Sequence, residues 1–127
     1  MGDAVQNRKN RRNGTVWESA LRDFFREQGF GAERLRLAGK EDEGDLIVHE
    51  PFVDGGERMF VVEAKSGAIR PAAFVREAVA EARNYEKHRG YAPRDATGIV
   101  IIKQRGKGVL DSYVLTSVRE YFGICDG

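Results

Sequence analysis

Residues 58–65 read Arg-Met-Phe-Val-Val-Glu-Ala-Lys. The run is apolar at every position from 59 to 62 and becomes charged again only at Glu63 and Lys65. Apolar side chains on both faces are typical of a strand in the middle of a sheet that is covered on both sides. We therefore expect a central strand here, and the two charges at its end require a physical reason.

The preceding segment predicts a strand that pairs with this one. Residues 45–49 alternate between two faces, with Asp45 at the start of the run. Residues 51–57 contain a proline and two adjacent glycines, a composition that indicates the connection of a hairpin. In a hairpin the start of the first strand lies beside the end of the second, so we expect Asp45 and Glu63 to be neighbours.

Further elements follow outward from this hairpin. Apolar residues at helical spacing after Thr15, a good N-cap, predict a helix over 15–28 that Gly29 ends. Residues 33–38 alternate and predict an extended segment, and Pro71 opens a second helix that ends near Gly90. Residues 97–103 and 112–115 predict two more strands, with a helical turn at 118–122. The fold class expected is α/β or α+β, with helices flanking a mixed central sheet.

Length and composition limit the class of protein. The 127 residues suit one domain, and 41% hydrophobic with 32% charged residues indicate a folded chain. We expect a domain over 15–127, preceded by a mobile basic arm at 1–14. No apolar run approaches the length of a membrane span and no secretory signal is visible, which predicts a cytoplasmic protein. Cys125 is the only cysteine, so an intrachain disulfide and a cysteine-based zinc site are excluded.

Three residues of the hairpin suit the hydrolysis of a phosphodiester. Glu63 and Lys65 are two positions apart, so an extended backbone directs both side chains to one face. Asp45 and Glu63 could together hold Mg2+, which commonly takes one or two protein carboxylates and completes its coordination with water and phosphate oxygens. The ammonium of Lys65 could orient the attacking water or stabilise charge in the transition state.

These residues resemble the PD-(D/E)XK nuclease superfamily, and within it the archaeal-type and phage-encoded Holliday junction resolvases. The resemblance covers most of the chain. It rests on Glu18, on Gly29-Phe30 with Arg34, Arg36 and the Gly39 loop, on Gly44-Asp45-Leu46-Ile47, and on Val62-Glu63-Ala64-Lys65-Ser66.

The resemblance implies a restriction-endonuclease-like fold and a metal held by Asp45, Glu63 and the Ala64 carbonyl. Lys65 would assist the attacking water, and Glu18 would contact a water bound to that metal. It also implies a homodimer, because cutting two opposed strands of a four-way junction requires two sites related by a two-fold axis. The glutamine and tyrosine of many exonuclease members have no clear equivalent at 81–85, which favours an endonuclease.

Several residues have a structural alternative. A glutamate and a lysine two positions apart are common on surface strands, and Glu18 would complete a capping box with Thr15. The acids at 41–43 could be additional ligands, although a solvated loop is the commoner arrangement. His49 could approach the site but suits a structural position, and His88 suits the C-terminal end of a helix dipole.

Basic residues predict contact with a nucleic acid, since lysine and arginine neutralise phosphates without sequence preference. The arm at 1–14 has the alternative role of a solubilising tail. The candidates are Arg8, Lys9, Arg11, Arg12, Arg34, Arg36, Lys103, Arg105 and Lys107.

The function expected is that of a Mg2+-dependent endonuclease, with Mn2+ as a substitute, that acts on branched DNA in a bacterial, archaeal or phage-infected cell. A Holliday junction resolvase fits best. The alternatives are another structure-specific or restriction-like nuclease of the superfamily and a junction-binding protein that does not cut.

Overall fold

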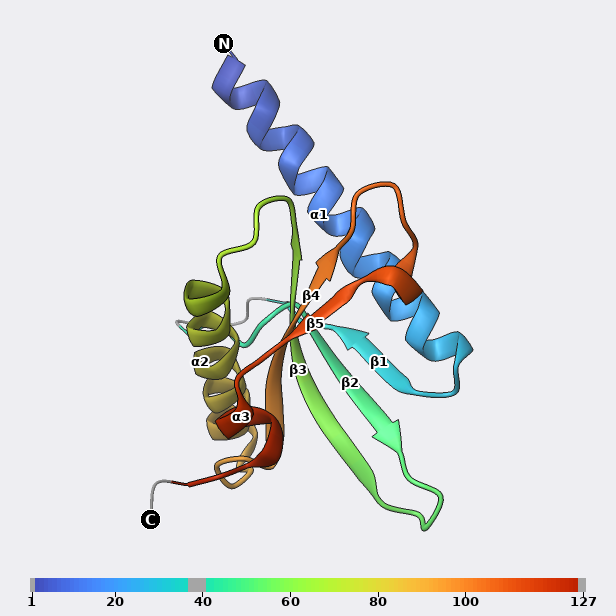
Figure 1. Ribbon diagram of the computed structural model, residues 1–127, viewed down its shortest axis with the longest axis vertical. Helices are drawn as coiled ribbons and strands as arrows, with labels where there is room; N and C mark the ends of the chain where they lie inside the picture. Colours follow the sequence, from blue (N-terminus) through green and yellow to red (C-terminus); the bar gives the residue numbers. More distant parts are fainter. Residues whose placement is uncertain (1, 37–40, 126–127) are drawn as a thin grey trace.

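The computed structural model describes residues 2–36 and 41–125, and of residues 2–13 it describes the backbone alone. In this part of the chain a mixed sheet has the strand order β1-β2-β3-β4-β5 (Figure 1). The strands are β1 (Gly31–Arg34), β2 (Leu46–Pro51), β3 (Glu57–Ser66), β4 (Ala96–Lys103) and β5 (Tyr113–Leu115). The helices are α1 (Gly2–Glu27), α2 (Pro71–Arg89) and α3 (Val118–Phe122), with a short 3-10 helix at Val109–Asp111.

Strand β3 lies at the centre of the sheet, as its sequence predicts. It pairs antiparallel with β2 through the expected hairpin and parallel with β4. A parallel pair needs a crossover connection, which α2 supplies. Strands β1 and β5 add antiparallel edges. The C-terminal ends of β3 and β4 therefore lie side by side at one end of the sheet.

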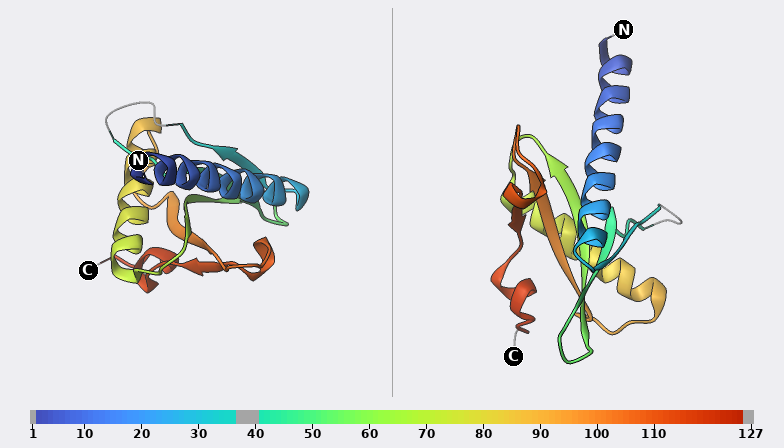
Figure 2. Two further views of the ribbon diagram at one scale, coloured as in Figure 1. Left: turned by 90° about the horizontal axis from the view of Figure 1, so that it is seen from above. Right: turned by 90° about the vertical axis from the view of Figure 1, so that its right-hand side faces the viewer.

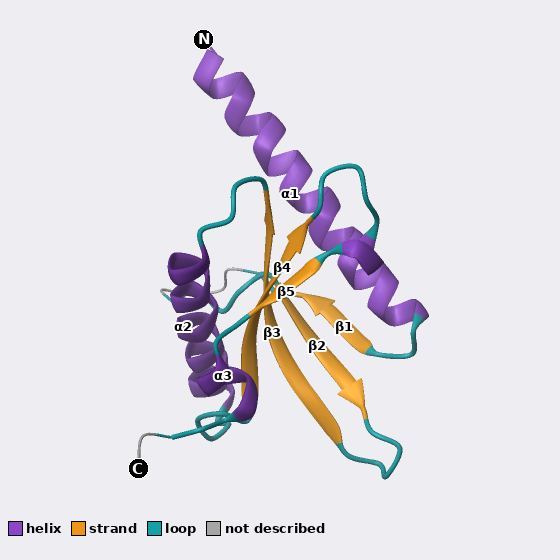
Figure 3. Cartoon of the chain, viewed as in Figure 1, coloured by secondary structure: helices purple, strands orange, loops and turns teal. Residues whose placement is uncertain are grey.

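The helices cover both faces of the sheet (Figure 3). Trp17 and Leu21 of α1 pack against Leu46 and Val48 of β2 in one apolar cluster. The opposite face carries α2, whose Ala82 and Tyr85 pack with Ile47 and Val61. The alternation predicted for β2, with Ile47 on one face and Leu46 and Val48 on the other, is confirmed. Beyond the sheet, the N-terminal part of α1 projects away from the rest of the fold (Figure 2).

Helix α2 lies unusually close to β4 at Gly98. A Cβ atom at this position would lie 2.4 Å from the carbonyl oxygen of Ala78. Only glycine allows this approach, and the small side chains of Ala78 and Ala82 complete the contact with the sheet. The depth at which α2 sits, and hence the position of its polar side chains, depends on this contact.

Two predicted boundaries are wrong. The first helix begins at Gly2 and not at Thr15, so the backbone of residues 2–14 is helical and the N-cap assigned to Thr15 does not exist. Good helix formers at 4–12, including alanine, glutamine, lysine and arginine, explain this extension. The extended segment expected at 33–38 is a strand at Gly31–Arg34, and residues 37 and 38 lie outside the described part.

The other elements agree with the predictions to within one or two residues. Pro71 opens α2, and Gly90 ends it in the left-handed conformation with φ of 73°. Over the described residues the fold is α+β, a mixed five-stranded sheet flanked by three helices, and the predicted fold class is confirmed. Among the described helices, none combines the length and apolarity that crossing a membrane requires.

Candidate active site

The pairing of β2 with β3 places Asp45 beside Glu63. Leu46 lies opposite Val62, and the amide of Asp45 donates a 2.9 Å hydrogen bond to the Val62 carbonyl. The amide of Ala64 in turn donates a 2.8 Å hydrogen bond to Oδ2 of Asp45. The Asp45 carboxylate is thereby held against the segment that carries Glu63, as the hairpin prediction required.

Glu63 and Lys65 lie on the same face of the sheet, the face covered by α2. Nζ of Lys65 is 3.5 Å from Oε1 of Glu63. Glu63 is 7% exposed, and its Oε2 is buried without a hydrogen-bond donor from any described residue. Burial, followed by a hydrogen bond with Glu81 and the charge of Asp45, raises the pKa of Glu63 strongly. Such a carboxyl group needs a proton or a cation.

Glu18 approaches Asp45 from α1 on the opposite face. Burial, and after it the charge of Asp45 and a hydrogen bond to it, raise the pKa of Glu18 to about 7. Arg34 of β1 lies 3.5 Å from Oε2 of Glu18 and opposes this rise. Because Thr15 is inside the helix, the capping-box alternative for Glu18 is wrong. Its side chain is instead part of the carboxylate group around Asp45.

Two further acids, which were not among the residues predicted from the sequence, reach the same place from α2. Glu77 and Glu81 lie one helical turn apart, and their carboxylates form a group with Glu63 in which the oxygens are within 4.8 Å of one another. Nζ of Lys65 is 3.1 Å from Oε2 of Glu77. A signal was present, because Glu81 occupies the apolar stripe of α2 between Ala78 and Tyr85.

The loop before Asp45 is anchored to the end of α2. Glu43 is buried and accepts hydrogen bonds from Arg89 and His88. Burial raises the pKa of Glu43, but these two hydrogen bonds outweigh it and lower the pKa overall. Glu41 bonds to Lys87 and His88. The expectation of a solvated acidic loop is therefore wrong for Glu43, which fixes the loop that leads into Asp45.

The histidines occupy structural positions, as expected. Nδ1 of His49 lies 2.9 Å from Oε1 of Glu57 across the β2–β3 hairpin. His88 sits in the last turn of α2, where Glu43 and Glu41 raise its pKa by hydrogen bonding. Neither ring contacts Glu63 or Asp45 among the contacts of the described residues.

Basic side chains lie around the end of the sheet that carries Glu63. Lys103 is paired with Ser66 across β3 and β4, directly after Lys65, and is exposed. The loop that follows exposes Arg105 and Lys107. On the other side Arg36 is exposed and Arg34 is held by Glu18. The side chains of Arg8, Lys9, Arg11 and Arg12 lie outside the described part of the chain.

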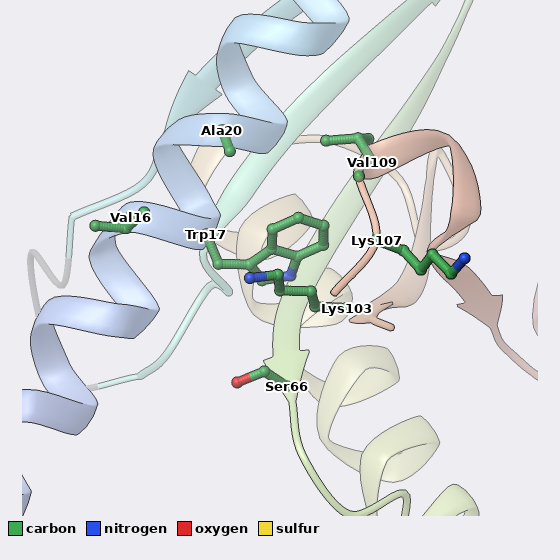
Figure 4. Close-up of a pocket in the computed structure, with 8 residues that line it drawn as sticks. Val16, Trp17, Ala20, Ser66, Lys103, Lys107 and Val109 are labelled. Atoms are coloured by element: carbon green, nitrogen blue, oxygen red, sulfur yellow. The ribbon is translucent and has the colours of Figure 1, made fainter. Parts of the chain in front are cut away.

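A pocket of about 450 Å³ opens beside the strand end, between α1 and the loop after β4. Its lining includes Trp17, Ser66, Lys103 and Lys107 (Figure 4). The Lys103 ammonium lies 5.9 Å from the centre of the Trp17 ring. The pocket combines a hydroxyl group and two ammonium groups, which suits a phosphate oxygen rather than a cation.

The donor set at the centre fits a divalent cation. Asp45 and Glu63 supply two carboxylates close enough for the charge of Asp45 to raise the pKa of Glu63, and carboxylates are the ligands that Mg2+ and Mn2+ prefer. The buried Oε2 of Glu63 lacks a donor, so a cation there would neutralise its charge. Among the described residues, the ammonium of Lys65 is the positive charge that lies next to the Glu63 carboxylate.

Comparison with known proteins gives a likeness in structure. No protein-family model matches the chain, and no curated protein matches it. The fold is similar to that of Hjc, a Holliday junction resolvase from the archaeal hyperthermophile Archaeoglobus fulgidus, with a TM-score of 0.51 and 17% sequence identity. The match covers 79% of this chain and 72% of Hjc. At this identity the likeness establishes the fold.

Proposed function

We propose that this protein is a metal-dependent DNA endonuclease that hydrolyses phosphodiester bonds in branched DNA, and that its substrate is the four-way Holliday junction. The observation that carries the proposal is the meeting of Asp45, Glu63 and Lys65 at one end of the sheet. The fold shared with a junction resolvase supports it.

Asp45 and Glu63, with the carbonyl of Ala64, would hold Mg2+, or Mn2+ in its place. When bound, a divalent ion polarises the phosphate and lowers the pKa of water, which supplies a nucleophile near neutral pH. The Ala64 amide keeps Asp45 in place through its 2.8 Å hydrogen bond to Oδ2. The pairing of β2 with β3 therefore preorganises the ligands.

Lys65 and Glu18 act on the substrate side of this arrangement. The ammonium of Lys65 lies between Glu63 and Glu77 and is positioned to stabilise negative charge that develops on the phosphate. Glu18, whose pKa is raised to about 7, can exchange a proton near neutral pH. It can thus orient a water molecule beside Asp45 or take a proton from it.

Basic residues would bind the phosphates that flank the scissile bond. Lys103, Arg105 and Lys107 extend from the strand next to Lys65, and the pocket beside Ser66 suits a phosphate oxygen. Arg34 and Arg36 would bind on the other side, and the four basic residues of the N-terminal helix farther along the DNA. Two such sites in a homodimer would cut opposed strands of one junction.

The test is cleavage of a labelled four-way junction, compared with a flap, a nicked duplex and a linear duplex, by wild type and Glu63→Ala in Mg2+ and in EDTA. We expect paired symmetric nicks in the junction from the wild type in Mg2+ alone. Preference for a flap or a nick would assign another structure-specific nuclease. Junction binding without cleavage in Mg2+ or Mn2+ would refute the enzymatic proposal.

A further inference from the structure

Helix α2 carries two carboxylates, those of Glu77 and Glu81, that approach Glu63. Glu77 and Glu81 are four residues apart, so they project from the same face of the helix. One oxygen from each, with one from Glu63, forms a group in which every pair of atoms is within 4.8 Å. Asp45 is not part of this group. The three acids therefore surround a second position beside Glu63.

Glu81 is the most deeply buried of the three acids. It is 3% exposed, and apart from a proton that Glu63 could share with it, neither of its carboxylate oxygens has a hydrogen-bond donor in the part of the chain that the structure describes. The oxygen of Glu63 that points away from Lys65, Oε2, is also buried without a donor. A buried carboxylate without donors is strongly destabilised unless a cation or a proton accompanies it.

One ammonium group balances the cluster only in part. Lys65 lies within 3.5 Å of Glu63 and 3.1 Å of Glu77, on the more exposed side of the group. No contact joins it to Glu81 among the described side chains. If all three carboxylates were ionised, the group would therefore carry two negative charges more than Lys65 balances. The oxygens buried without a donor are Oε2 of Glu63 and both oxygens of Glu81.

The loop before Asp45 lies close to the cluster. Gly44 adopts φ of 93°, and a Cβ atom added there would lie 2.9 Å from Cγ1 of Val61 and 3.3 Å from Oε2 of Glu81. The loop that leads into Asp45 thus passes directly over the Glu81 carboxylate. Hard divalent cations bind in such oxygen-lined positions, where several carboxylates converge.

We propose that Glu63, Glu77 and Glu81 bind a divalent cation of the Mg2+ or Mn2+ class, at a subsite separate from the one assigned to Asp45 and Glu63. The inference deepens the proposed nuclease function, on which it rests, because Glu63 is common to both subsites. Glu81 and Glu77 are then ligands supplied by the crossover helix, and Glu77 also pairs with Lys65.

The experiment is calorimetric titration of the full chain with Mn2+, using wild type, Glu81→Gln, Asp45→Asn and the control Glu27→Gln. Glu27 is exposed at the end of α1, so its variant makes the same charge change away from the cluster. We expect two Mn2+ ions per chain for wild type and control, and one for each of the other variants. If Glu81→Gln still binds a second Mn2+ ion, its affinity for that ion should be about tenfold or more below that of wild type.

The folded state is checked by melting each variant in EDTA. Glu81→Gln keeps the side-chain size and removes a buried charge, so its melting temperature in EDTA should equal or exceed that of wild type. Mn2+ should raise that temperature less than it raises the wild-type value. If Glu81→Gln does not fold, Glu77→Gln, which changes a half-exposed side chain, gives the same readout.

The inference is overturned if Glu81→Gln, or Glu77→Gln in its place, binds Mn2+ with the wild-type number and affinity. Glu81 then holds only a proton shared with Glu63. This outcome leaves the proposed function intact where wild type cuts the junction and Asp45→Asn does not. Failure of wild type to cut any DNA, with Mn2+ bound at Glu81, would reject the nuclease and retain the ion subsite.

Discussion

Oδ2 of Asp45 accepts a 2.8 Å hydrogen bond from the backbone amide of Ala64, the residue between Glu63 and Lys65. A single contact thus joins a side chain at the start of β2 to the backbone of β3. It fixes the carboxylate with respect to both charged residues and costs no side-chain donor. Substitutions of Asp45 can therefore separate the effect of its negative charge from the effect of this hydrogen bond.

Asp45→Asn keeps an oxygen that can accept from Ala64 and removes the charge. We expect cleavage of the four-way junction to fall about a hundredfold or more, because the substitution removes a carboxylate from the proposed metal site. The melting temperature in EDTA should not fall, since repulsion with Glu63 and Glu18 is relieved. Asp45→Ala should lose activity and also melt lower. Equal melting temperatures for the two variants would show that the hydrogen bond is unimportant.

Lys65→Met removes the ammonium and keeps much of the side-chain volume. The rate of cleavage at saturating enzyme should fall about a hundredfold, because charge on the phosphate is no longer stabilised in the transition state. Junction affinity, measured in Ca2+ to prevent cleavage, should change little. A large loss of affinity with an unchanged single-turnover rate would assign Lys65 to DNA binding and not to chemistry.

Lys103→Ala and Lys107→Ala should weaken junction binding in a salt-dependent way. Each variant is expected to reduce the slope of log affinity against log salt by about one, because each lysine is proposed to contact one phosphate. The control is Lys87→Ala, an exposed lysine near the far end of α2. Slopes equal to wild type for both loop variants would place the DNA on another surface.

The stability of the metal-free protein should depend on pH through His88. Hydrogen bonds to Glu43 and then Glu41 raise the pKa of His88 above 6.5, so the folded state binds this proton more tightly than the unfolded state. The contribution of protonated His88 to the free energy of unfolding is complete below about pH 6.5 and disappears as pH rises through the raised pKa of the folded state. Wild type should therefore exceed His88→Gln in stability at about pH 6 and approach it at about pH 9.

Urea denaturation in EDTA at several pH values measures this difference directly. Subtracting the His88→Gln curve from the wild-type curve removes the shared contributions of Glu18, Glu63 and Glu81, whose raised pKa values act in the same direction. A difference that grows with pH would contradict the assigned ion pairs.

Gly98→Ala should destabilise the fold by more than about 2 kcal/mol, because its Cβ would overlap the backbone carbonyl of Ala78. Helix α2 would have to move away from β4, and Glu77 and Glu81 would move with it. Thermal melting measures the stability, and Mn2+ affinity measures the displacement. Gly108→Ala is a suitable control, since a Cβ there has no neighbour within 4 Å. Similar melting of the two variants would refute the close contact.

The hairpin and the crossover helix were predictable because their signals are local. The alternation of 45–49, the apolar run of β3 and the Pro71 and Gly90 boundaries each depend on residues adjacent in the chain. The start of α1 was not predictable in this way. Gly14 and Thr15 have the composition of a helix start, but the good helix formers before them carry the helix through to Gly2.

The sequence by itself determined the neighbourhood of Asp45, Glu63 and Lys65, because strand alternation and hairpin register leave these side chains one arrangement. Only the tertiary structure decided which other charges meet them. Glu81 reaches Glu63 because α2 sits directly on β4, and Glu18 reaches Asp45 because α1 covers the other face. The physical reason is that a helix periodicity fixes which face is buried, whereas the position of that face over the sheet depends on packing between distant segments.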